Sequence, residues 1–131
     1  MGIDLASFAG RGGSVDEPAL KRCLEACVDV GEALHDVLAW PTADLQHDAW
    51  LNRRLAIVLS GFGDLLRMKG MTPSEHGSLR YLNQLLLWLR MSAQSRSRAL
   101  AMRTEPLPAI ALSDPSHALP RGSIRDDWRR R

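Results

Sequence analysis

The sequence contains few aromatic residues, few β-branched residues and little net charge. Aromatic side chains make up 5% of its 131 residues, whereas leucine, alanine and arginine are abundant, and this composition favours helices over strands. Seventeen basic against fifteen acidic side chains leave a formal charge of +2, far from the strongly basic balance of a dedicated nucleic-acid-binding protein. Fifteen of the seventeen are arginine, an excess that we interpret as the codon bias of a GC-rich bacterial genome.

No stretch of the sequence is long and apolar enough to cross a membrane. The longest aliphatic or aromatic runs are Leu55–Leu59 and Leu85–Leu89, and a transmembrane helix needs about 20 residues. Asp4 interrupts the first residues, where a secretory signal would have its apolar core. Cys23 and Cys27 lie four residues apart on one face of an expected helix, a spacing that suits a disulfide poorly. We therefore expect a cytoplasmic protein with two reduced thiols.

The first expected helix covers residues 16–38. Asp16, Glu17 and Pro18 supply an N-cap, a favourable first-turn charge and a proline that the first turn tolerates. Pro41 ends the helix, because a residue that precedes proline disfavours the helical conformation. The apolar residues recur at helical spacing and form the expected inner seam, which consists of Leu20, Leu24, Cys27, Gly31, Leu34 and Leu38.

The second expected helix covers residues 43–69 and is capped by Thr42 or Asp44. Gly70 follows it and predicts a left-handed C-terminal cap. Gly61 and Gly63 interrupt the pattern and cost about 2 kcal/mol of helix propensity, which leaves open a kink or a short break. The expected inner stripe consists of Leu51, Leu55, Val58, Phe62, Leu65 and Leu66.

The third and longest expected helix covers residues 72–103. It opens with Thr72-Pro73-Ser74-Glu75, a pattern typical of a capping box with proline in the first turn. Apolar residues then recur at alternating intervals of three and four, as in a helix packed in a bundle. These expected inner residues are Leu79, Leu82, Leu86, Leu89 and Ala93.

Together the three patterns predict an all-α fold, an antiparallel three-helix bundle in an up-down-up order. The two links between the helices are very short, and short links make successive helices antiparallel neighbours. We place the bundle domain at residues 14–103. The glycines of residues 1–13 predict a flexible N-terminal arm, and the four prolines of residues 104–131 predict a disordered C-terminal tail.

The third expected helix is apolar on more than one side, and two interpretations remain open. It is either the central, most buried helix, or its second stripe faces a protein partner or a second copy of the chain in a homodimer. Only the second interpretation predicts a function, that of a non-enzymatic interaction or adaptor module. The residues expected to bind the partner lie on the flank of helices two and three: Trp50, Ile57, Tyr81, Leu85, Trp88 and Met91.

Charge is unevenly distributed between the first and third expected helices. The first carries six acidic against two basic side chains, and the third carries five basic against one acidic. These charges either face one another across the bundle or form a basic end for phosphate groups. The alternative function is therefore a nucleic-acid-associated regulator that uses the tail arginines together with Arg90, Arg96, Arg98 and Arg103.

Metal binding and catalysis find less support in the sequence. The pairs Glu32–His35 and Asp44–His47 have the Glu-x-x-His type of spacing found in di-iron bundles. Glu32 projects away from the apolar seam of its helix, however, so we expect no metal site and no cofactor. No serine or cysteine belongs to a recognisable nucleophile–base pattern, so we do not expect an enzyme.

Overall fold

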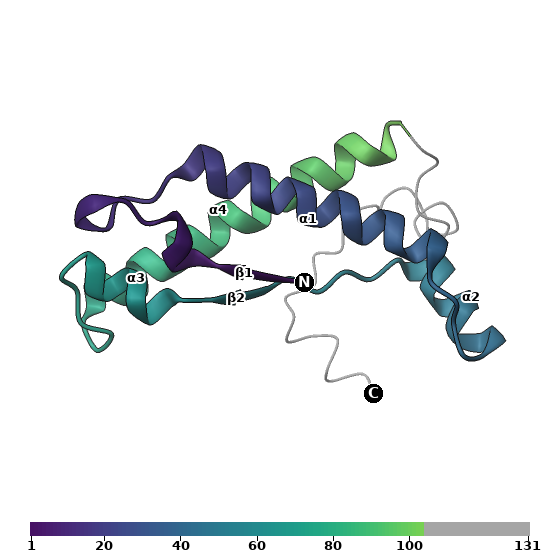
Figure 1. Ribbon diagram of the computed structural model, residues 1–131, viewed down its shortest axis with the longest axis horizontal. Coiled ribbons are helices and arrows are strands. Elements are labelled where there is room, and N and C mark those ends of the chain that lie inside the picture. The colour runs from purple at the N-terminus through teal and green to yellow at the C-terminus, as the bar shows by residue number, and fades with distance from the viewer. Residues whose placement is uncertain (104–131) are drawn as a thin grey trace.

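The structure is a computed structural model that describes residues 1–103, and this part of the chain is mostly helical (Figure 1). Four helices and a small parallel sheet replace the predicted arrangement of three helices alone. In chain order the elements are strand β1 (Gly2–Asp4), the 3-10 turns η1 (Leu5–Phe8) and η2 (Arg11–Gly13), helix α1 (Glu17–Val37), helix α2 (Ala43–Asn52), strand β2 (Val58–Ser60), helix α3 (Phe62–Met68) and helix α4 (His76–Ala101).

Helices α1 and α4 lie side by side and run in the same direction (Figure 1). Glu17 near the start of α1 is close enough to Tyr81 to act on it electrostatically, and Asp29 further along binds Arg96. Residues 43–68 form the return leg between the two helices. The first and last long helices are therefore parallel, but residues 43–68 between them are not one helix.

The prediction of a single helix over residues 43–69 is wrong. Helix α2 ends at Asn52, because Arg53 adopts a left-handed conformation with φ of 42°. The chain then stays extended, and β2 pairs in parallel with β1, with Ile3 opposite Leu59. Gly61, with φ of 73°, starts the short helix α3. Glycine suits this conformation because a Cβ would destabilise it.

The first residues are not a flexible arm, and this prediction is also wrong. Ile3 and Leu5 are only 2% and 1% exposed and belong to the hydrophobic core. The Asp4 carboxylate accepts hydrogen bonds from the Ala6 amide and the Ser7 hydroxyl, which fixes the turn η1. An apolar side chain at every second residue, rather than the glycines nearby, decides the structure of this segment. The predicted tail, residues 104–131, lies outside the described part of the chain.

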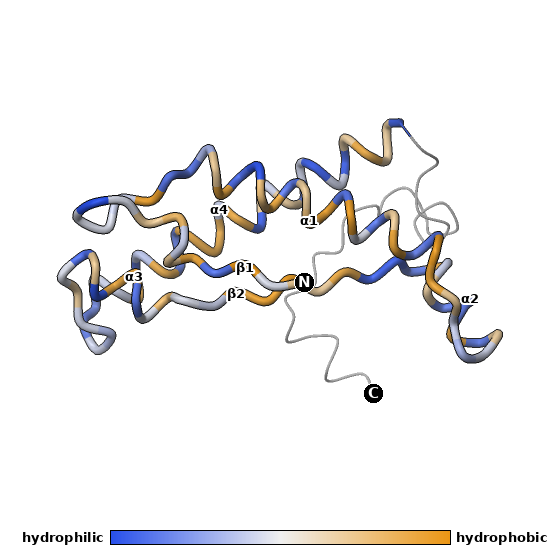
Figure 2. The backbone as a smooth tube through the Cα atoms, viewed as in Figure 1, coloured by the Kyte–Doolittle hydropathy of each residue, from blue (hydrophilic) through white to orange (hydrophobic). Residues whose placement is uncertain are grey.

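The core sits where the N-terminal halves of α1 and α4 meet β1, η1 and α3. Hydropathy alternates along both long helices, as expected for helices with one apolar face (Figure 2). The predicted seam of α1 is correct for its first half only, because Leu34 and Leu38 are exposed. The buried core residues of this cluster are Ile3, Leu5, Leu20, Leu24, Leu65, Leu85 and Leu89.

The predicted inner stripe of the longest helix is correct only in part, because Leu89 is buried and Ala93 packs against the core but other members are exposed. Leu85 is buried, and Tyr81 and Trp88 pack partly buried against the core, whereas Leu79 and Leu86 are exposed. Both stripes have helical spacing, so the spacing alone does not decide which residues the rest of the fold covers. The side chains of α4 that are buried are Ser78, Leu85, Leu89 and Ser92.

Most predicted helix ends are confirmed, but the capping box is not. Asp16 and Thr42 accept hydrogen bonds from backbone amides three residues later, at 2.9 and 3.3 Å, and Gly70 is left-handed. Helix α4, however, begins at His76 without a side-chain cap. Residues 72–75 form a separate turn, and the Ser78 hydroxyl donates to the carbonyl of Thr72 at 2.6 Å.

Gly13 and Gly12 provide a test of how the turn η2 packs on α3. Both are left-handed, but a Cβ on Gly13 would lie 2.6 Å from the Lys69 backbone nitrogen, whereas nothing lies within 4 Å of one on Gly12. We expect Gly12→Ala to lower the free energy of unfolding by about 1 kcal/mol through backbone strain. Gly13→Ala should cost roughly 1–3 kcal/mol more through overlap with Lys69. Denaturant unfolding measures both, and equal losses would contradict the packing of η2 on α3.

The burial of the first strand can be tested in the same way. Ile3→Ala and Leu5→Ala should each lower the free energy of unfolding by about 3 kcal/mol, because each leaves a cavity in the core. Val58→Ala in the neighbouring strand is the control. Its side chain is exposed, so the loss should stay below about 1 kcal/mol. A flexible N-terminal segment would show no loss for Ile3 and Leu5.

Candidate interaction surface

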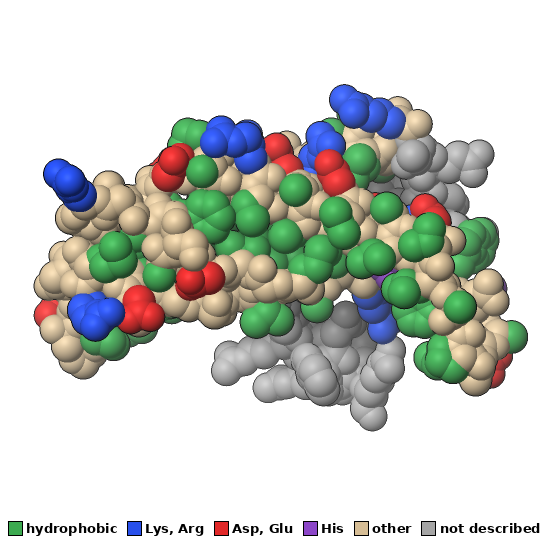
Figure 3. Space-filling model, viewed as in Figure 1, with side chains coloured by type: hydrophobic (Ala, Val, Ile, Leu, Met, Phe, Trp, Pro, Cys, Tyr) green, Lys and Arg blue, Asp and Glu red, His purple; other side chains and the backbone are tan. Residues whose placement is uncertain are grey.

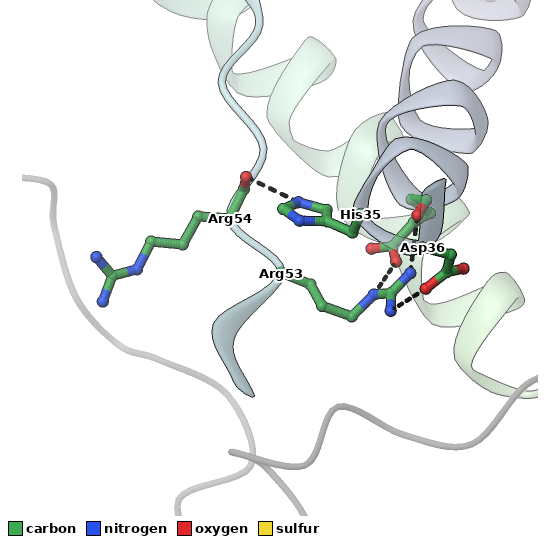
Figure 4. A network of polar contacts seen from close by, with 5 residues as sticks. His35, Asp36, Arg53 and Arg54 are labelled. Atoms are coloured by element: carbon green, nitrogen blue, oxygen red, sulfur yellow. Dashed lines mark hydrogen bonds and ion pairs between the residues drawn. The ribbon is translucent and has the colours of Figure 1, made fainter. Parts of the chain in front are cut away.

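A cluster of ionic hydrogen bonds at Arg53 ties the end of α2 to the last turns of α1 (Figure 4). The Arg53 guanidinium donates to Glu32 Oε2 and to Asp36 Oδ1, both at 2.7 Å, and to the backbone carbonyl of Glu32 at 2.8 Å. The hydrogen bond from Arg53 lowers the pKa of Asp36 below its ordinary value. Arg53 thus both ends α2 and holds the return leg against α1.

The segment after Arg53 continues along α1. His35 Nε2 donates to the backbone carbonyl of Arg54 at 3.1 Å, while the Arg54 side chain points away from the cluster (Figure 4). The Leu55 side chain then lies against Gly31, where a Cβ would come within 2.5 Å of it. Gly31 therefore provides the close approach that its place on the predicted seam suggested. The return leg is held against one side of α1 only.

Another side of α1 stays uncovered within the described structure. Small or apolar residues recur along α1 at intervals of seven, as Ala26 and Ala33 or Val30 and Val37 do. Seven residues are nearly two helical turns, so the members of each pair lie on the same side of the helix. The core buries Leu20, Leu24 and Val28 on one side of the helix. The adjoining arc is exposed, most strongly at Val30 (50%) and Val37 (76%). We call this arc the α1 apolar surface, and it consists of Ala26, Val30, Ala33, Leu34 and Val37.

The α1 apolar surface continues toward α2. Leu38 beyond the end of α1 and Leu45 and Trp50 on α2 are also exposed. Figure 3 shows hydrophobic side chains gathered over α1 and the region of α2, with charged side chains along the margins. Isolated exposed apolar residues are ordinary, but a contiguous group of this kind is typical of an interaction site.

The six residues predicted to bind a partner do not form one surface. Trp50 is exposed on α2, where it contacts the ring of His47. Met91 is exposed on α4, Ile57 is partly buried against the core, and Leu85 lies inside it, as described for α4. Alanine and valine recur every seven residues in the first helix, and this pattern could have indicated the exposed face. The prediction from the sequence did not use it.

The basic residues of α4 are divided between the inside and the outside of the fold. Arg96 donates to both carboxylate oxygens of Asp29 at 2.7 and 2.6 Å, and its hydrogen bond lowers the pKa of Asp29. Within residues 1–103, Arg90, Arg98 and Arg103 form no ion pair and are exposed. The uneven charge of the two helices is thus partly an internal ion pair.

The candidate metal ligands are dispersed or already engaged. Glu32 binds Arg53, and His35 binds the Arg54 carbonyl. Residues 1–103 contain no group of three or more His, Cys, Asp or Glu side chains that could hold a metal ion. Cys23 and Cys27 are free thiols packed against the core, and burial together with the nearby Cys23 raises the pKa of Cys27, which disfavours its reactive thiolate.

Helix length and the comparisons with known proteins give two further findings. No helix within residues 1–103 is long and apolar enough to span a bilayer. The chain matches no protein family model and no curated protein. We therefore infer its function from the geometry and chemistry of its own side chains.

The Arg53 cluster predicts a pH-dependent loss of stability. Arg53→Met should lower the free energy of unfolding by about 1 kcal/mol near neutral pH, because partly exposed ion pairs contribute modestly. The folded pKa of Asp36 lies below its unfolded value, so its stabilisation is complete above the unfolded pKa. It is lost as the pH falls through the folded pKa. The difference in the free energy of unfolding between wild type and variant should therefore shrink as the pH falls.

Denaturant unfolding at several pH values checks this expectation, with Arg54→Met as the control. The Arg54 side chain lies outside the cluster, so its replacement should change the stability little at any pH. A loss of equal size in both variants would contradict the role of Arg53.

Proposed function

We propose that this chain is a non-enzymatic protein-interaction module that binds its partner through the α1 apolar surface and the adjoining residues of α2. The observation that carries the proposal is the exposure of Val30 and Val37 on a helix whose opposite side is packed in the core. Burying exposed valine or leucine side chains against a partner would contribute about 1.5–3 kcal/mol for each side chain fully covered.

The rigidity of this surface supports the proposal. Its residues belong to one helix of 21 residues, which is held at one end by the core and at the other by Arg53. A surface that is already ordered loses little conformational entropy when it binds. Ala26 and Ala33 add no bulk, so the backbone of a partner helix can approach closely.

The nucleic-acid alternative receives less support. Of the four arginines on which it depends, Arg96 is bound to Asp29. Arg90, Arg98 and Arg103 remain as candidate phosphate contacts, and contacts of this kind would make binding fall steeply with salt concentration.

A pair of double variants tests the proposal. Leu34→Lys with Val37→Lys should abolish any complex that the chain forms, whether with itself or with a protein from its host, because the new charges would have to be buried. Both side chains are exposed in the single chain, so the helix content should not change. Light scattering during size-exclusion chromatography measures the mass of the complex, and circular dichroism measures the helix content.

The control is Leu79→Lys with Leu87→Lys, two exposed leucines of α4 outside the proposed surface. This variant should keep the complex. A complex that survives in the α1 variant, or a bare monomer in every sample, would contradict the proposed function.

A further inference from the structure

We infer that the outward side of α4 docks on the surface of a membrane that contains anionic phospholipids. This site is separate from the α1 apolar surface and does not depend on the proposed function. The inference rests on three properties of α4: the single sign of its charge, the apolar side chains between its arginines, and the inward position of its aromatic rings. The first property attracts lipid phosphates, and the other two favour a lipid surface over a nucleic acid.

The charge of α4 has one sign along its whole length. The helix contains four arginines and no aspartate or glutamate. Arg96 binds Asp29 of α1. The other three are exposed and form no ion pair within residues 1–103: Arg80, Arg90 and Arg98. Arg103 follows the helix and adds a fourth exposed charge. Four or more basic side chains on one helix are typical of a site for anionic lipids.

Large apolar side chains lie between these arginines. On the side of α4 away from the core, residues follow one another at intervals of seven and four and so form one row, which consists of Arg80, Leu87, Met91 and Arg98. Leu86 and Arg90 lie beside this row. The side chains of Leu86, Leu87 and Met91 are 40%, 58% and 61% exposed. We call these six residues the α4 basic surface.

The aromatic rings of α4 face the fold. Tyr81 stacks with Phe62 and lies under the Lys69 ammonium, and Trp88 packs against the core. Single-stranded nucleic acids stack their bases on exposed aromatic rings, and the phosphates of a duplex offer no apolar partner to leucine or methionine. A bilayer interface suits both kinds of side chain on the α4 basic surface, because the aliphatic groups enter the acyl boundary while the guanidinium groups reach the phosphates.

The acidic side chains of α1 that act on α4 do not cancel this charge. Glu25 and Asp29 both act electrostatically on Arg96. Asp29 binds Arg96 at 2.6 Å, and Glu25 lies 3.9 Å from Lys21. Each carboxylate thus has a basic partner, and the outward arginines remain available to lipid phosphates. The 26 residues of α4 extend about 39 Å, so the helix can lie flat and bring these arginines to the headgroups together.

The test is sedimentation of the full chain with lipid vesicles. Wild type should bind vesicles of mixed phosphatidylcholine and phosphatidylglycerol, and should bind phosphatidylcholine alone at least about tenfold more weakly. Added salt should weaken the binding, because it screens the charges. Arg90→Gln with Arg98→Gln should weaken binding to the mixed vesicles roughly 25-fold, about fivefold for each charge. Leu87→Gln with Met91→Gln should weaken it at least about tenfold, because these side chains no longer enter the bilayer.

Two control variants make the same chemical changes elsewhere. Arg11→Gln with Arg54→Gln removes two exposed arginines outside α4. Val30→Gln with Val37→Gln removes two exposed side chains of the α1 apolar surface. Both controls should bind the mixed vesicles like wild type. All of these changes affect exposed side chains, so circular dichroism should show the helix content of wild type in every variant.

Three outcomes would overturn the inference. Wild type that does not bind the mixed vesicles would exclude the lipid surface, and binding of a DNA duplex in the same buffer would then assign the arginines to nucleic acid. Binding that the α4 variants retain, or that the controls lose equally, would place the lipid contact elsewhere. A loss in the arginine variant alone would show adsorption by charge without entry of Leu87 and Met91. Arg80→Gln with Arg90→Gln replaces the first variant should that variant fail to fold.

Discussion

The burial of Ile3 and Leu5 beneath the two long helices is the constraint on which the rest of this fold depends. Two parallel helices cannot enclose a core by themselves, and of the two helices in the return leg only the seven-residue α3 contributes to the core. The first strand fills the remaining space. Its pairing with β2 requires residues 58–60 to be extended, so the middle of the chain cannot be one helix. The turn geometry at Arg53 and at Gly61 follows from the same requirement.

The core occupies one end of the molecule, and this explains why α1 is buried on its core side in its first half and more exposed in its second half. The first half of α1 packs against the core elements β1, η1 and α4, while its second half contacts Arg96 of α4 and the segment from Arg53 to Leu55. Leu34 and Val37 also recur at helical spacing, but within residues 1–103 they are 38% and 76% exposed. An exposed apolar surface arises here because the sequence continues an apolar pattern beyond the elements that cover it within residues 1–103.

The parts of the fold that could be predicted from the sequence are those set by local chemistry. Asp16, Thr42 and Gly70 determine helix ends through hydrogen bonds and backbone conformations within a few residues, and all three were identified correctly. The parts that could not be predicted depend on contacts between distant residues. Nothing near Leu85 or Leu86 indicates which of them will meet Leu20. The same holds for Arg53, whose three acceptors lie in α1 and are far from it along the chain.

The pairing of β1 with β2 has a consequence for the order in which the chain folds. Each residue of β1 meets a partner 56 positions later, as Gly2 does with Val58. During synthesis, which proceeds from the N-terminus, β1 leaves the ribosome before β2 and cannot reach its final position until β2 has followed. Contacts over such sequence separations slow folding. The strand made first is therefore among the last elements to be fixed, and until then Ile3 and Leu5 remain exposed to other chains.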